Sequence, residues 1–411
     1  MTYQQALQYL YSSQPAFHLI GKEAYKPGLG NTYALMRHLH NPHECFRSVH
    51  VAGTNGKGSV SHTLAAVFQA AGYKTALYTS PHLVDFRERI RINGQMIPKE
   101  AVVAFVEQNS ELLDTVKPSF FETTMAMAFQ HFAEEKVDIA IVEVGLGGRL
   151  DSTNIISPCL SIITNIGFDH TEFLGTTLAQ IASEKAGTIK EGIPVVVSEM
   201  TAETREVFYA KAALTHSRLI EVEHSGAHQS LYQLCQLKGI YQRKNIDCVV
   251  AAAAELRHQG YALSDEALET GLRRVCELTG LRGRWETLSE QPKVICDTGH
   301  NSHGVKAYID ALNEYEKLNI VFGMVSDKDV KDVLRLLPRH ARYFFTQAQT
   351  TRAIPAHKLQ QLGAAAGLIG CAYHSVSEAL NEAIKKADKD TVVFIGGSNY
   401  VVGEALQAFD S

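Results

Sequence analysis

The sequence predicts an α/β fold with parallel, doubly wound sheets, divided into two domains. Near the start of the chain, a β-branched run enters a glycine-rich loop and a long apolar-periodic segment leaves it, which is the order strand, loop, helix. Further along, near-continuous apolar runs alternate with helical patterns, as in parallel sheets covered by helices on both faces. A second series of strands begins late, and 411 residues are too many for one ordinary core.

The glycine-rich loop lies within Val49–Ser59, where Gly53, Gly56 and Gly58 surround Lys57. Glycine has no Cβ, so backbone N–H groups can close around a phosphate, and the following helix dipole favours an anion there. Lys57 would add a charge on the outer phosphates, and the serine could cap the helix or face a magnesium ion. The strict P-loop spacing is not met, because Gly58 separates lysine from serine. A tight strand-to-helix turn is the alternative, but three glycines around a lysine favour phosphate binding.

The first domain is expected to continue as alternating strands and helices. Residues 1–45 are predicted to be helical, with a glycine-bearing turn at Lys26–Gly30. Strands are expected at 74–78, 138–144, 160–165 and 194–197, and helices at 99–113, 122–134 and 178–190.

The second domain is predicted from its own series of strands, at 294–297, 319–322, 343–346 and 392–395. Helical patterns at 303–312, 330–337 and 377–386 lie between them. Charged and turn-forming residues interrupt the apolar periodicity at Arg284–Pro292. We therefore expect the first domain to comprise residues 1–287 and the second residues 288–411.

Composition excludes several classes of protein. The chain is 45% hydrophobic and 20% charged with a formal net charge of −5, so no basic surface favours a nucleic-acid partner. No segment approaches the ~20 apolar residues of a membrane span, and the start lacks the features of a signal peptide. The seven cysteines are scattered without a CxxC spacing. We expect buried free thiols in a reducing cytoplasm rather than disulfides or a zinc site.

Polar residues at predicted strand ends indicate where chemistry could occur in the first domain. Glu143 ends an apolar strand and precedes Gly145-Leu146-Gly147-Gly148, at the rim where parallel sheets bind ligands. A carboxylate there could hold a magnesium ion that bridges nucleotide phosphates. Pairing of Glu143 with Arg149 is the alternative. Asp169 and His170 follow the strand at 160–165 and are expected at the same rim.

Three polar loops end strands of the second domain and suggest a second binding face. They are Asp297-Thr298-Gly299-His300-Asn301, the segment with Asp327 and Asp329 after Phe322-Gly323, and Gly396-Gly397-Ser398-Asn399. Ordinary loop and N-cap chemistry is the alternative, and we expect no more than that of Asp329.

Several motifs, in this order along the chain, resemble the folylpolyglutamate synthase and dihydrofolate synthase family of the Mur-ligase superfamily. The stretches that carry the resemblance are His50–Ser59, Thr79–Leu83 with Arg87–Gly94, Glu143–Asp151, Asn165–His170, Ser183–Gly187, Arg282–Glu286, Asp297–Asn301 and Gly396–Gly403. The resemblance implies a P-loop domain, a smaller Rossmann-like domain and an active site in the cleft between them. It also implies that ATP phosphorylates a folate or pteroate carboxylate, and that the amine of glutamate then attacks the acyl phosphate.

The resemblance assigns site residues as follows. Asn55, Gly56, Lys57, Gly58 and Ser59 would cradle the ATP phosphates, with Asn245, Arg284 and Asp297 as further nucleotide contacts. Magnesium would be held by Ser80, Glu143 and His170. The pterin site would comprise Ser119, Phe120, Phe121, Glu122, Leu150, Asp151 and Ser152. His300 and Ser398 would lie near the incoming glutamate. The catalytic residues would be Lys57, His170, Lys185, Asp297 and His300.

Lys185 in Ser183–Gly187 corresponds to a lysine that is often carbamylated by carbon dioxide in this family. Carbamylation requires a neutral amine, so the site must lower the lysine pKa from about 10.4. Burial or nearby cations would do so, and the resulting carbamate could orient a histidine or bind a second magnesium ion. An ordinary lysine, paired with Glu184 or facing a phosphate, is the alternative.

Two loops depart from the family pattern. Gly299 stands where family members commonly have alanine, and Ser302 where they have proline. Asn399 replaces the usual leucine. Because the phosphate loop keeps its pattern, we expect ATP to be used, whereas the departures concern the acceptor site.

The prediction is therefore an ATP-dependent ligase that joins L-glutamate to a folate or dihydropteroate carboxylate and acts as a cytoplasmic monomer. A Mur-type ligase acting on another carboxylate is one rival, against which the Thr79–Leu83 stretch argues. A nucleotide-binding switch without ligase chemistry is the other. The sequence does not distinguish glutamate addition to dihydropteroate from extension of a polyglutamate tail.

Overall fold

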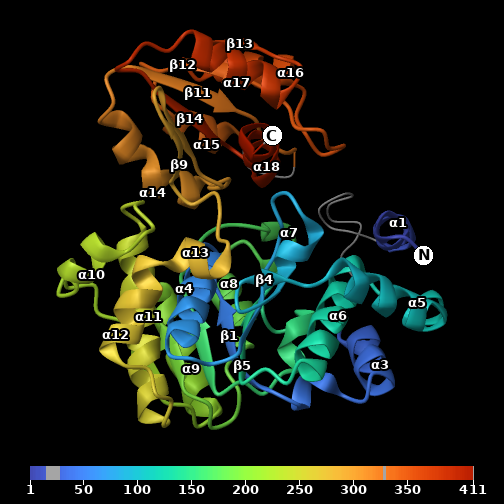
Figure 1. Ribbon diagram of the computed structural model, residues 1–411. Coiled ribbons are helices and arrows are strands. Elements are labelled where there is room, and N and C mark those ends of the chain that lie inside the picture. Colours follow the sequence, from blue (N-terminus) through green and yellow to red (C-terminus); the bar gives the residue numbers. More distant parts are fainter. Residues whose placement is uncertain (15–27, 327–329, 411) are drawn as a thin grey trace. The chain divides into compact units, whose positions relative to one another are not determined.

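The computed structural model describes residues 1–14, 28–326 and 330–410. It forms two compact units (Figure 1). Unit 1 comprises Met1–His82, Phe86–Gln236 and Gln242–Leu281, and unit 2 comprises Leu83–Asp85, Leu237–Tyr241 and Arg282–Ser411. The expected domain boundary at 287/288 stays a prediction. Lys26, Pro27 and the Asp327–Asp329 segment lie outside the described residues.

Unit 1 contains an eight-stranded sheet in the order β4-β3-β2-β5-β1-β6-β7-β8. The strands from β2 to β8 in this order are parallel, and the hairpin β3–β4 adds an antiparallel edge. The strands are β1 Arg47–Ala52, β2 Thr75–Tyr78, β3 Ile90–Ile92, β4 Gln95–Met96, β5 Ile139–Glu143, β6 Leu160–Ile163, β7 Val195–Val197 and β8 Leu219–Glu221. In β1, β2, β5, β6 and β7 nearly every residue is buried, which is why β5, β6 and β7 are mainly apolar in sequence.

Helices cover both faces of this sheet (Figure 1). The helices of unit 1 are α1 Tyr3–Ser13, α3 Gly30–His38, α4 Lys57–Ala70, α5 Lys99–Val116, α6 Phe120–Glu134, α7 Thr171–Leu174, α8 Leu178–Ala186, α9 Ala202–Leu214, α10 Gln229–Leu234, α11 Gln242–His258, α12 Asp265–Arg273 and α13 Val275–Thr279. Short 3-10 turns lie at Pro42–Glu44, Phe86–Arg89 and Ser152–Ile155. α4 packs against α11, α12 and the sheet, and its residues 59–68 are all buried, so the helix leaving the glycine loop is a core element.

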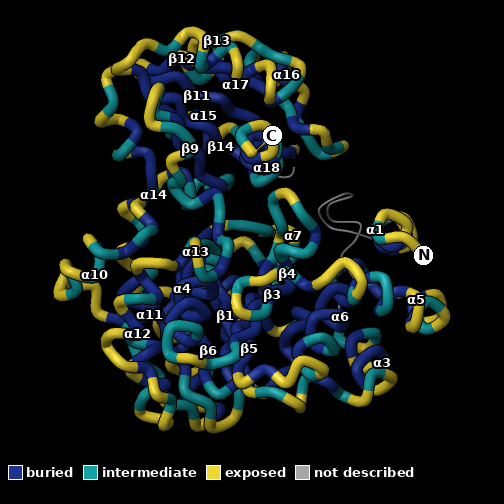
Figure 2. The backbone as a smooth tube through the Cα atoms, viewed as in Figure 1, coloured by how far each residue is buried: buried dark blue, intermediate teal, exposed yellow. Residues whose placement is uncertain are grey.

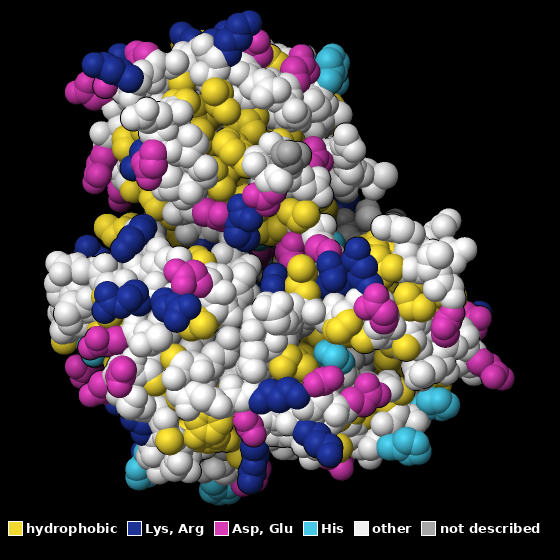
Figure 3. Space-filling view, in the orientation of Figure 1, with side chains coloured by type: hydrophobic (Ala, Val, Ile, Leu, Met, Phe, Trp, Pro, Cys, Tyr) yellow, Lys and Arg dark blue, Asp and Glu magenta, His cyan; other side chains and the backbone are white. Residues whose placement is uncertain are grey.

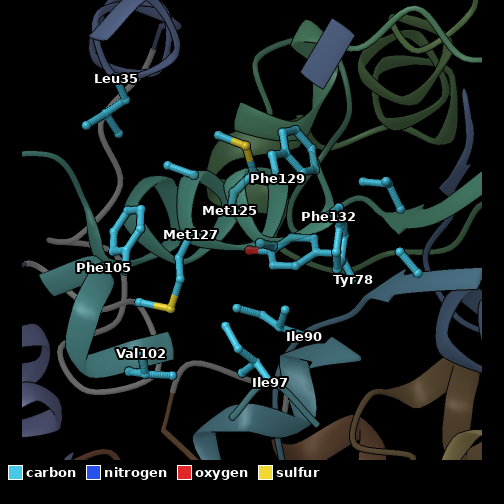
Figure 4. Packing of buried hydrophobic residues seen from close by; sticks show 14 of the residues in the cluster. Leu35, Tyr78, Ile90, Ile97, Val102, Phe105, Met125, Met127, Phe129 and Phe132 are labelled. Atoms are coloured by element: carbon cyan, nitrogen blue, oxygen red, sulfur yellow. The ribbon is translucent and has the colours of Figure 1, made fainter. Parts of the chain in front are cut away.

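One core of unit 1 lies between β2, β5 and the helices α5 and α6. Figure 4 shows Met125, Phe129 and Phe132 of α6 packed beside Tyr78 of β2. The Tyr78 hydroxyl is fully buried but hydrogen-bonds to the Thr124 hydroxyl at 3.1 Å, so no polar group of this ring is left without a partner.

Unit 2 contains a six-stranded sheet in the order β13-β12-β11-β14-β10-β9, parallel except for β9. The strands are β9 Glu286–Glu290, β10 Lys293–Cys296, β11 Leu318–Phe322, β12 Arg342–Phe345, β13 Ile369–Ala372 and β14 Val392–Gly396. The helices are α14 Ser302–Asn313, α15 Val330–Leu336, α16 Ala356–Ala365, α17 Val376–Lys385 and α18 Asn399–Asp410. The prediction of two α/β units built on mainly parallel sheets is confirmed.

Alternation along the unit 2 strands builds two cores. Ile320 and Phe322 pack with α14, α15 and α16, whereas Val321 between them packs with α17 and α18. The helices therefore cover opposite faces of the sheet, and Figure 2 shows β11 and β14 buried between them. On the face shown in Figure 3, acidic and basic side chains are interspersed on each unit.

The interruption expected at Arg284–Pro292 contains a strand, β9, that the sequence analysis missed. β9 pairs antiparallel with β10 at the edge of the sheet and carries one apolar residue, Leu288, among polar ones. β13 at the opposite edge is largely exposed and contains Gly370. Edge strands face water along part of their length, so β9 is mainly polar, and the short apolar residues of β13 are interrupted by Gly370.

The cysteines are all free, but the expectation that they are all buried is wrong. Cys235, Cys248 and Cys296 are buried, whereas Cys45 and Cys371 are exposed. Both exposed cysteines lie near the ends or edges of elements, where no core residue is required. Among the described helices, none is both long and apolar enough to cross a membrane.

Replacing Gly271 by alanine should destabilise the protein, although alanine is the better helix former by about 1 kcal/mol. Gly271 lies in α12, and a Cβ there would stand 2.7 Å from the backbone of Val67 in α4. Because two helices would have to separate, we expect a loss of about 1–3 kcal/mol in the free energy of unfolding, measured in urea.

Gly30→Ala is the matched control, because Gly30 begins α3 and a Cβ there meets nothing within 4 Å. It should be neutral or slightly stabilising. Equal unfolding midpoints for both variants would show that the α4–α12 contact does not require glycine.

Candidate active site

The loop after β1 is fixed by two glycines in left-handed backbone conformations. Gly53 has a φ of +145°, and a Cβ there would stand 1.9 Å from the Thr164 hydroxyl oxygen. Gly56 has a φ of +84° and caps α4, and its Cβ would stand 2.4 Å from Asn245 Oδ1. Neither position has space for another residue, so the loop must pass close to β6 and α11. The Asn55 N–H donates to Asn165 Oδ1 at 2.9 Å, which ties the loop to the strand end on its other side.

Two lysine ammonium groups converge on the carbonyl oxygen of Gly53. Lys57 Nζ donates to it at 3.1 Å and to the Thr54 carbonyl at 3.2 Å. Lys185 Nζ donates to it at 2.9 Å from α8. Lys185 is 4% exposed, and burial, reinforced by the nearby charge of Lys57, lowers its pKa to about 7. A substantial fraction of this side chain is therefore a neutral amine near neutral pH.

The first turn of α4 is connected to α11. Gly58 lies in this turn, and the buried Ser59 hydroxyl accepts a hydrogen bond from Gln242 Nε2 at 3.2 Å. Asn245 Nδ2 donates to Gln242 Oε1 at 2.7 Å. The structure thus brings Asn245 to the phosphate loop, as expected, and adds Gln242, which sequence reasoning missed. The signal was present, because Gln242 lies three residues before Asn245 on one helical face.

Glu143 ends β5, which lies between β1 and β2. Its Oε2 accepts the Ser80 N–H at 3.2 Å, so the carboxylate and the Ser80 residue are neighbours at the sheet rim. Arg149, the alternative partner of Glu143, pairs with Glu184 at 2.9 Å. His170 has a φ of +49°, and its N–H donates to Asp169 Oδ1 at 2.9 Å. His170 follows the loop after β6, two strands from Glu143 in the sheet.

Within the described parts of the chain, no three His, Cys, Asp or Glu side chains form a metal-binding group. Ser80, Glu143 and His170 supply a hydroxyl, one carboxylate and one imidazole. This set fits a magnesium ion that takes most of its ligands from water and phosphate oxygens, since magnesium usually binds proteins through few side chains.

The segment Ser119–Glu122 opens α6 and forms a capping box. The Glu122 N–H donates to the Ser119 hydroxyl at 3.2 Å, and the Ser119 N–H donates to Glu122 Oε2 at 2.7 Å. Phe120 is buried, with its ring stacked 5.2 Å from that of Tyr11. Phe121 covers Gly145, where a Cβ would stand 2.5 Å from the ring. In this structure Ser119 and Glu122 stabilise the helix end, and Phe121 is the member of the group that reaches the Gly145 loop.

Leu150, Asp151 and Ser152 follow the glycine-rich segment after β5. The buried Asp151 carboxylate accepts the N–H groups of Leu146 at 2.8 Å and Thr153 at 3.0 Å, and also the Thr153 hydroxyl. Burial raises the pKa of Asp151 despite these donors. Asp151 therefore holds the 145–153 loop together, so any role in substrate binding depends on the shape of this loop. Leu150 and Ser152 stand on either side of Asp151 in the same loop.

Asp297 in unit 2 directly follows β10 and is 3% exposed. It accepts hydrogen bonds from the Tyr241 hydroxyl at 2.5 Å and from the N–H groups of Trp285 and Gly299 at 2.9 and 2.8 Å. Burial raises the pKa of Asp297. Arg284 lies one residue before Trp285, so the two expected nucleotide contacts of unit 2 are neighbours.

His300 and Ser398 lie at the carboxyl ends of β10 and β14, which are adjacent strands. α14 leaves β10 toward one face of the sheet and α18 leaves β14 toward the other, which is the switch point where such sheets bind ligands. The Ser398 hydroxyl accepts the Val401 N–H at 3.2 Å and caps α18. His300 Nδ1 lies 3.0 Å from the Thr298 carbonyl, which can only accept, so Nδ1 is the donor of this contact.

Two groups of predicted residues are thus assembled within the units. Unit 1 brings together Asn55–Ser59, Ser80, Glu143, Lys185 and Asn245, and unit 2 brings together Arg284, Asp297, His300 and Ser398. Their roles stay predictions. Besides Gln242, the sequence analysis missed Tyr241 and assigned no partner to Thr298, because only the folded loops bring these side chains to Asp297 and Arg284.

Comparison with known proteins agrees with this architecture. Residues 51–257 match the Mur ligase middle domain, and residues 283–399 match the Mur ligase glutamate ligase domain. This domain pair on two mainly parallel sheets defines an ATP-dependent amide-forming ligase.

Individual relatives narrow the class. The chain is 34% identical to the dihydrofolate synthase/folylpolyglutamate synthase of Bacillus subtilis, over 92% of this chain and 94% of the relative. It resembles E. coli FolC in complex with DHPP and ADP, with a TM-score of 0.86, 28% identity and coverage of 100% and 98%. A bifunctional folylpolyglutamate synthase/dihydrofolate synthase with Mn, AMPPNP and L-glutamate bound gives a TM-score of 0.83, 29% identity and the same coverage. The chain belongs to the folylpolyglutamate synthase/dihydrofolate synthase family.

The buried Lys185 should make stability depend on pH. An unfolded lysine has a pKa of about 10.4, whereas burial lowers the pKa of Lys185 in the folded protein to about 7. Between these values the unfolded state binds a proton that the folded state does not, so the contribution of Lys185 to stability rises with pH in this window and does not change with pH below it. The free energy of unfolding of wild type minus that of Lys185→Met should therefore increase with pH in this window, by up to about 1.4 kcal/mol per pH unit.

This measurement uses buffers free of carbon dioxide and compares the two proteins at each pH, so that other titrating groups cancel. A difference that stays constant from pH 7 to 10 would mean that Lys185 keeps an ordinary pKa.

Proposed function

We propose that the protein uses ATP and L-glutamate to form an amide on a folate or dihydropteroate carboxylate, through an acyl phosphate. The observation that carries the proposal is the glycine loop with Lys57 at the start of α4, followed by a Mur-type glutamate ligase domain. Relatives of closely similar fold bind ADP or AMPPNP, DHPP, Mn and L-glutamate.

In the first step an oxygen of the substrate carboxylate attacks the terminal phosphorus of ATP, and ADP leaves. Backbone N–H groups of residues 56–59 and the Lys57 ammonium would stabilise the charge on the transferred phosphoryl group, with Asn55 in the same loop. Lys57 in this structure donates to the carbonyls of Gly53 and Thr54, and phosphate oxygens would replace these acceptors. Asn245 stands against Gly56 and would contact the nucleotide.

Magnesium would be held by Ser80, Glu143 and His170, and would supply charge neutralisation on the phosphates. The fit rests on the adjacent Ser80 and Glu143 groups, at 3.2 Å between Ser80 N and Glu143 Oε2. The acid substrate would lie against the loop shaped by Asp151 and the ring of Phe121, with Ser119, Phe120, Glu122, Leu150 and Ser152 forming its surroundings.

In the second step the glutamate amine attacks the acyl carbon, the phosphate leaves and an amide forms. The attacking amine must first lose a proton from its ammonium form. His300 would accept it in its neutral form, because the lone pair is then on Nε2 when Nδ1 donates to the Thr298 carbonyl. Ser398 would contact the amino acid, and Arg284 and Asp297 the nucleotide.

Lys185 is proposed to be carbamylated. Its neutral amine would attack carbon dioxide, lose one proton and become a carbamate, which carries a negative charge. The proposal is supported by the lowered pKa of Lys185, about 7, and by the pairing of Glu184 with Arg149, which leaves Lys185 without that carboxylate. The Lys57 ammonium repels a Lys185 ammonium, whereas it would attract a Lys185 carbamate. Action as a cytoplasmic monomer, without a nucleic-acid or membrane partner, stays a prediction.

Release of ADP tests the function. Wild-type protein should release ADP only when glutamate and an acid substrate are both present. Comparing dihydropteroate with a reduced folate shows which substrate is used. Lys57→Ala should lower the rate at least about 100-fold, because it removes a charge from the transition state.

Lys74→Ala is the control, since Lys74 pairs with Glu135 on the surface of unit 1, and its rate should stay within about twofold of wild type. Nucleotide binding without glutamate-dependent ADP release would instead favour a nucleotide-binding switch.

Carbamylation predicts chemical rescue. Lys185→Ala should lose activity and regain part of it with a short carboxylic acid at high concentration, because a free carboxylate can take the place of the carbamate. Lys57→Ala should not respond to the acid. Wild-type protein supplied with ¹³C-bicarbonate should show a carbamate carbon signal that Lys185→Ala lacks. A wild-type rate that ignores bicarbonate removal, together with no such signal, would refute the modification.

A further inference from the structure

The segment Arg282–Glu286 enters unit 2 through a backbone held in an unusual conformation. Gly283 has a φ of +71°, and Trp285, which is not glycine, has a φ of +51°. The Gly283 N–H donates to Glu286 Oε2 at 2.6 Å, and the Trp285 N–H donates to Asp297 Oδ2 at 2.9 Å. A left-handed non-glycine residue persists only where its surroundings hold it. Arg284 therefore extends from a fixed backbone.

Thr298 holds both the backbone and the side chain of this segment. It is 5% exposed, and its hydroxyl donates to the Gly283 carbonyl at 3.1 Å and accepts from Arg284 Nη1. This direction is required, because a carbonyl only accepts and a guanidinium only donates. The Thr298 N–H donates to the same Gly283 carbonyl at 3.1 Å. One threonine thus fixes where the Arg284 guanidinium lies.

The fixed part of the guanidinium is Nη1, which also donates to the Gly283 carbonyl at 3.2 Å. Among the described residues, Arg284 forms no ion pair, and neither Nε nor Nη2 donates a hydrogen bond. Nε–H and the adjacent Nη2–H form the edge of a guanidinium that binds two oxygens of a phosphate or carboxylate at once. The contact with Thr298 uses the other side and leaves this edge available.

We propose that Thr298 is a positioning residue that orients the Nε–Nη2 edge of Arg284 toward a pair of anionic oxygens, those of the nucleotide phosphates. The inference rests on the proposed function, in which Arg284 contacts the nucleotide. An amino-acid carboxylate has the same oxygen-pair chemistry, so the experiment must distinguish the two anions. Thr298 does not touch the substrate and acts only through Arg284.

The test compares Thr298→Val, which keeps the shape but removes the hydroxyl, with Thr298→Ser, which keeps the hydroxyl. ADP should bind about tenfold more weakly to Thr298→Val, since a hydrogen bond to a charged group is lost, while Thr298→Ser stays near wild type. Adenosine, which has no phosphate, should bind all of these proteins equally. The KM for ATP should rise in Thr298→Val and the KM for glutamate should not.

Two further variants complete the design. Thr346→Val is the matched control, because the Thr346 hydroxyl is buried in unit 2 without a hydrogen-bond partner among the described residues, and it should bind ADP as wild type does. Arg284→Ala should weaken ADP at least as much as Thr298→Val, and the double variant should be no weaker than Arg284→Ala alone.

Each other result has a distinct meaning. Weakened ADP binding in Arg284→Ala but not in Thr298→Val would overturn the role of Thr298 and leave the nucleotide contact standing. Unchanged ADP binding in Arg284→Ala would remove the nucleotide contact on which the inference rests. A raised KM for glutamate with unchanged ADP binding would assign the Arg284 edge to the amino acid and overturn the nucleotide assignment. A loss of ADP binding that Thr298→Ser shares would show damage to the loop rather than a lost hydroxyl.

Discussion

The phosphate loop and α8 of unit 1 are connected through the carbonyl oxygen of Gly53. This oxygen accepts hydrogen bonds from Lys57 and Lys185, and its backbone is available only because glycine tolerates both the φ of +145° and the contact with Thr164. Two ammonium groups at one oxygen repel each other, and the buried one is the easier to neutralise. The phosphate loop and α8 are therefore electrostatically coupled before any ligand arrives, and a change of charge on one lysine changes the favoured state of the other.

The parts of the fold that could be predicted from the sequence are the buried strands, because burial requires apolar residues. β5, β11 and β14 are covered on both faces, so their residues are nearly all apolar, and their positions were predicted to within one or two residues. β8, β9 and β13 lie at sheet edges, where a strand has a hydrogen-bonded neighbour on one side only and its side chains are partly exposed to solvent. A strand of that kind is stabilised by its neighbour, which the sequence of the strand itself does not reveal.

The candidate site was predictable at the level of motifs and strand ends, but not of contacts. Ser119 and Glu122 are residue types that suit a ligand or a capping box equally well, and only the start of α6 shows that they form the cap. The Asp151 carboxylate is similarly engaged with its own loop. In contrast, the lowered pKa of Lys185 depends on the burial of its amine, which required the positions of α8 and the Gly53 loop together.

The conformation of Trp285 has a spectroscopic consequence. It is the only tryptophan in the chain, and its ring lies 6.2 Å from that of Tyr308 and 5.9 Å from that of Phe394 within unit 2. Its backbone N–H is bound to Asp297, and its neighbour in sequence is Arg284. Tryptophan fluorescence therefore reports on the surroundings of Trp285 in unit 2. It registers the melting of unit 2 and events at the Arg284–Asp297 loop, while the phosphate loop of unit 1 has no indole of its own.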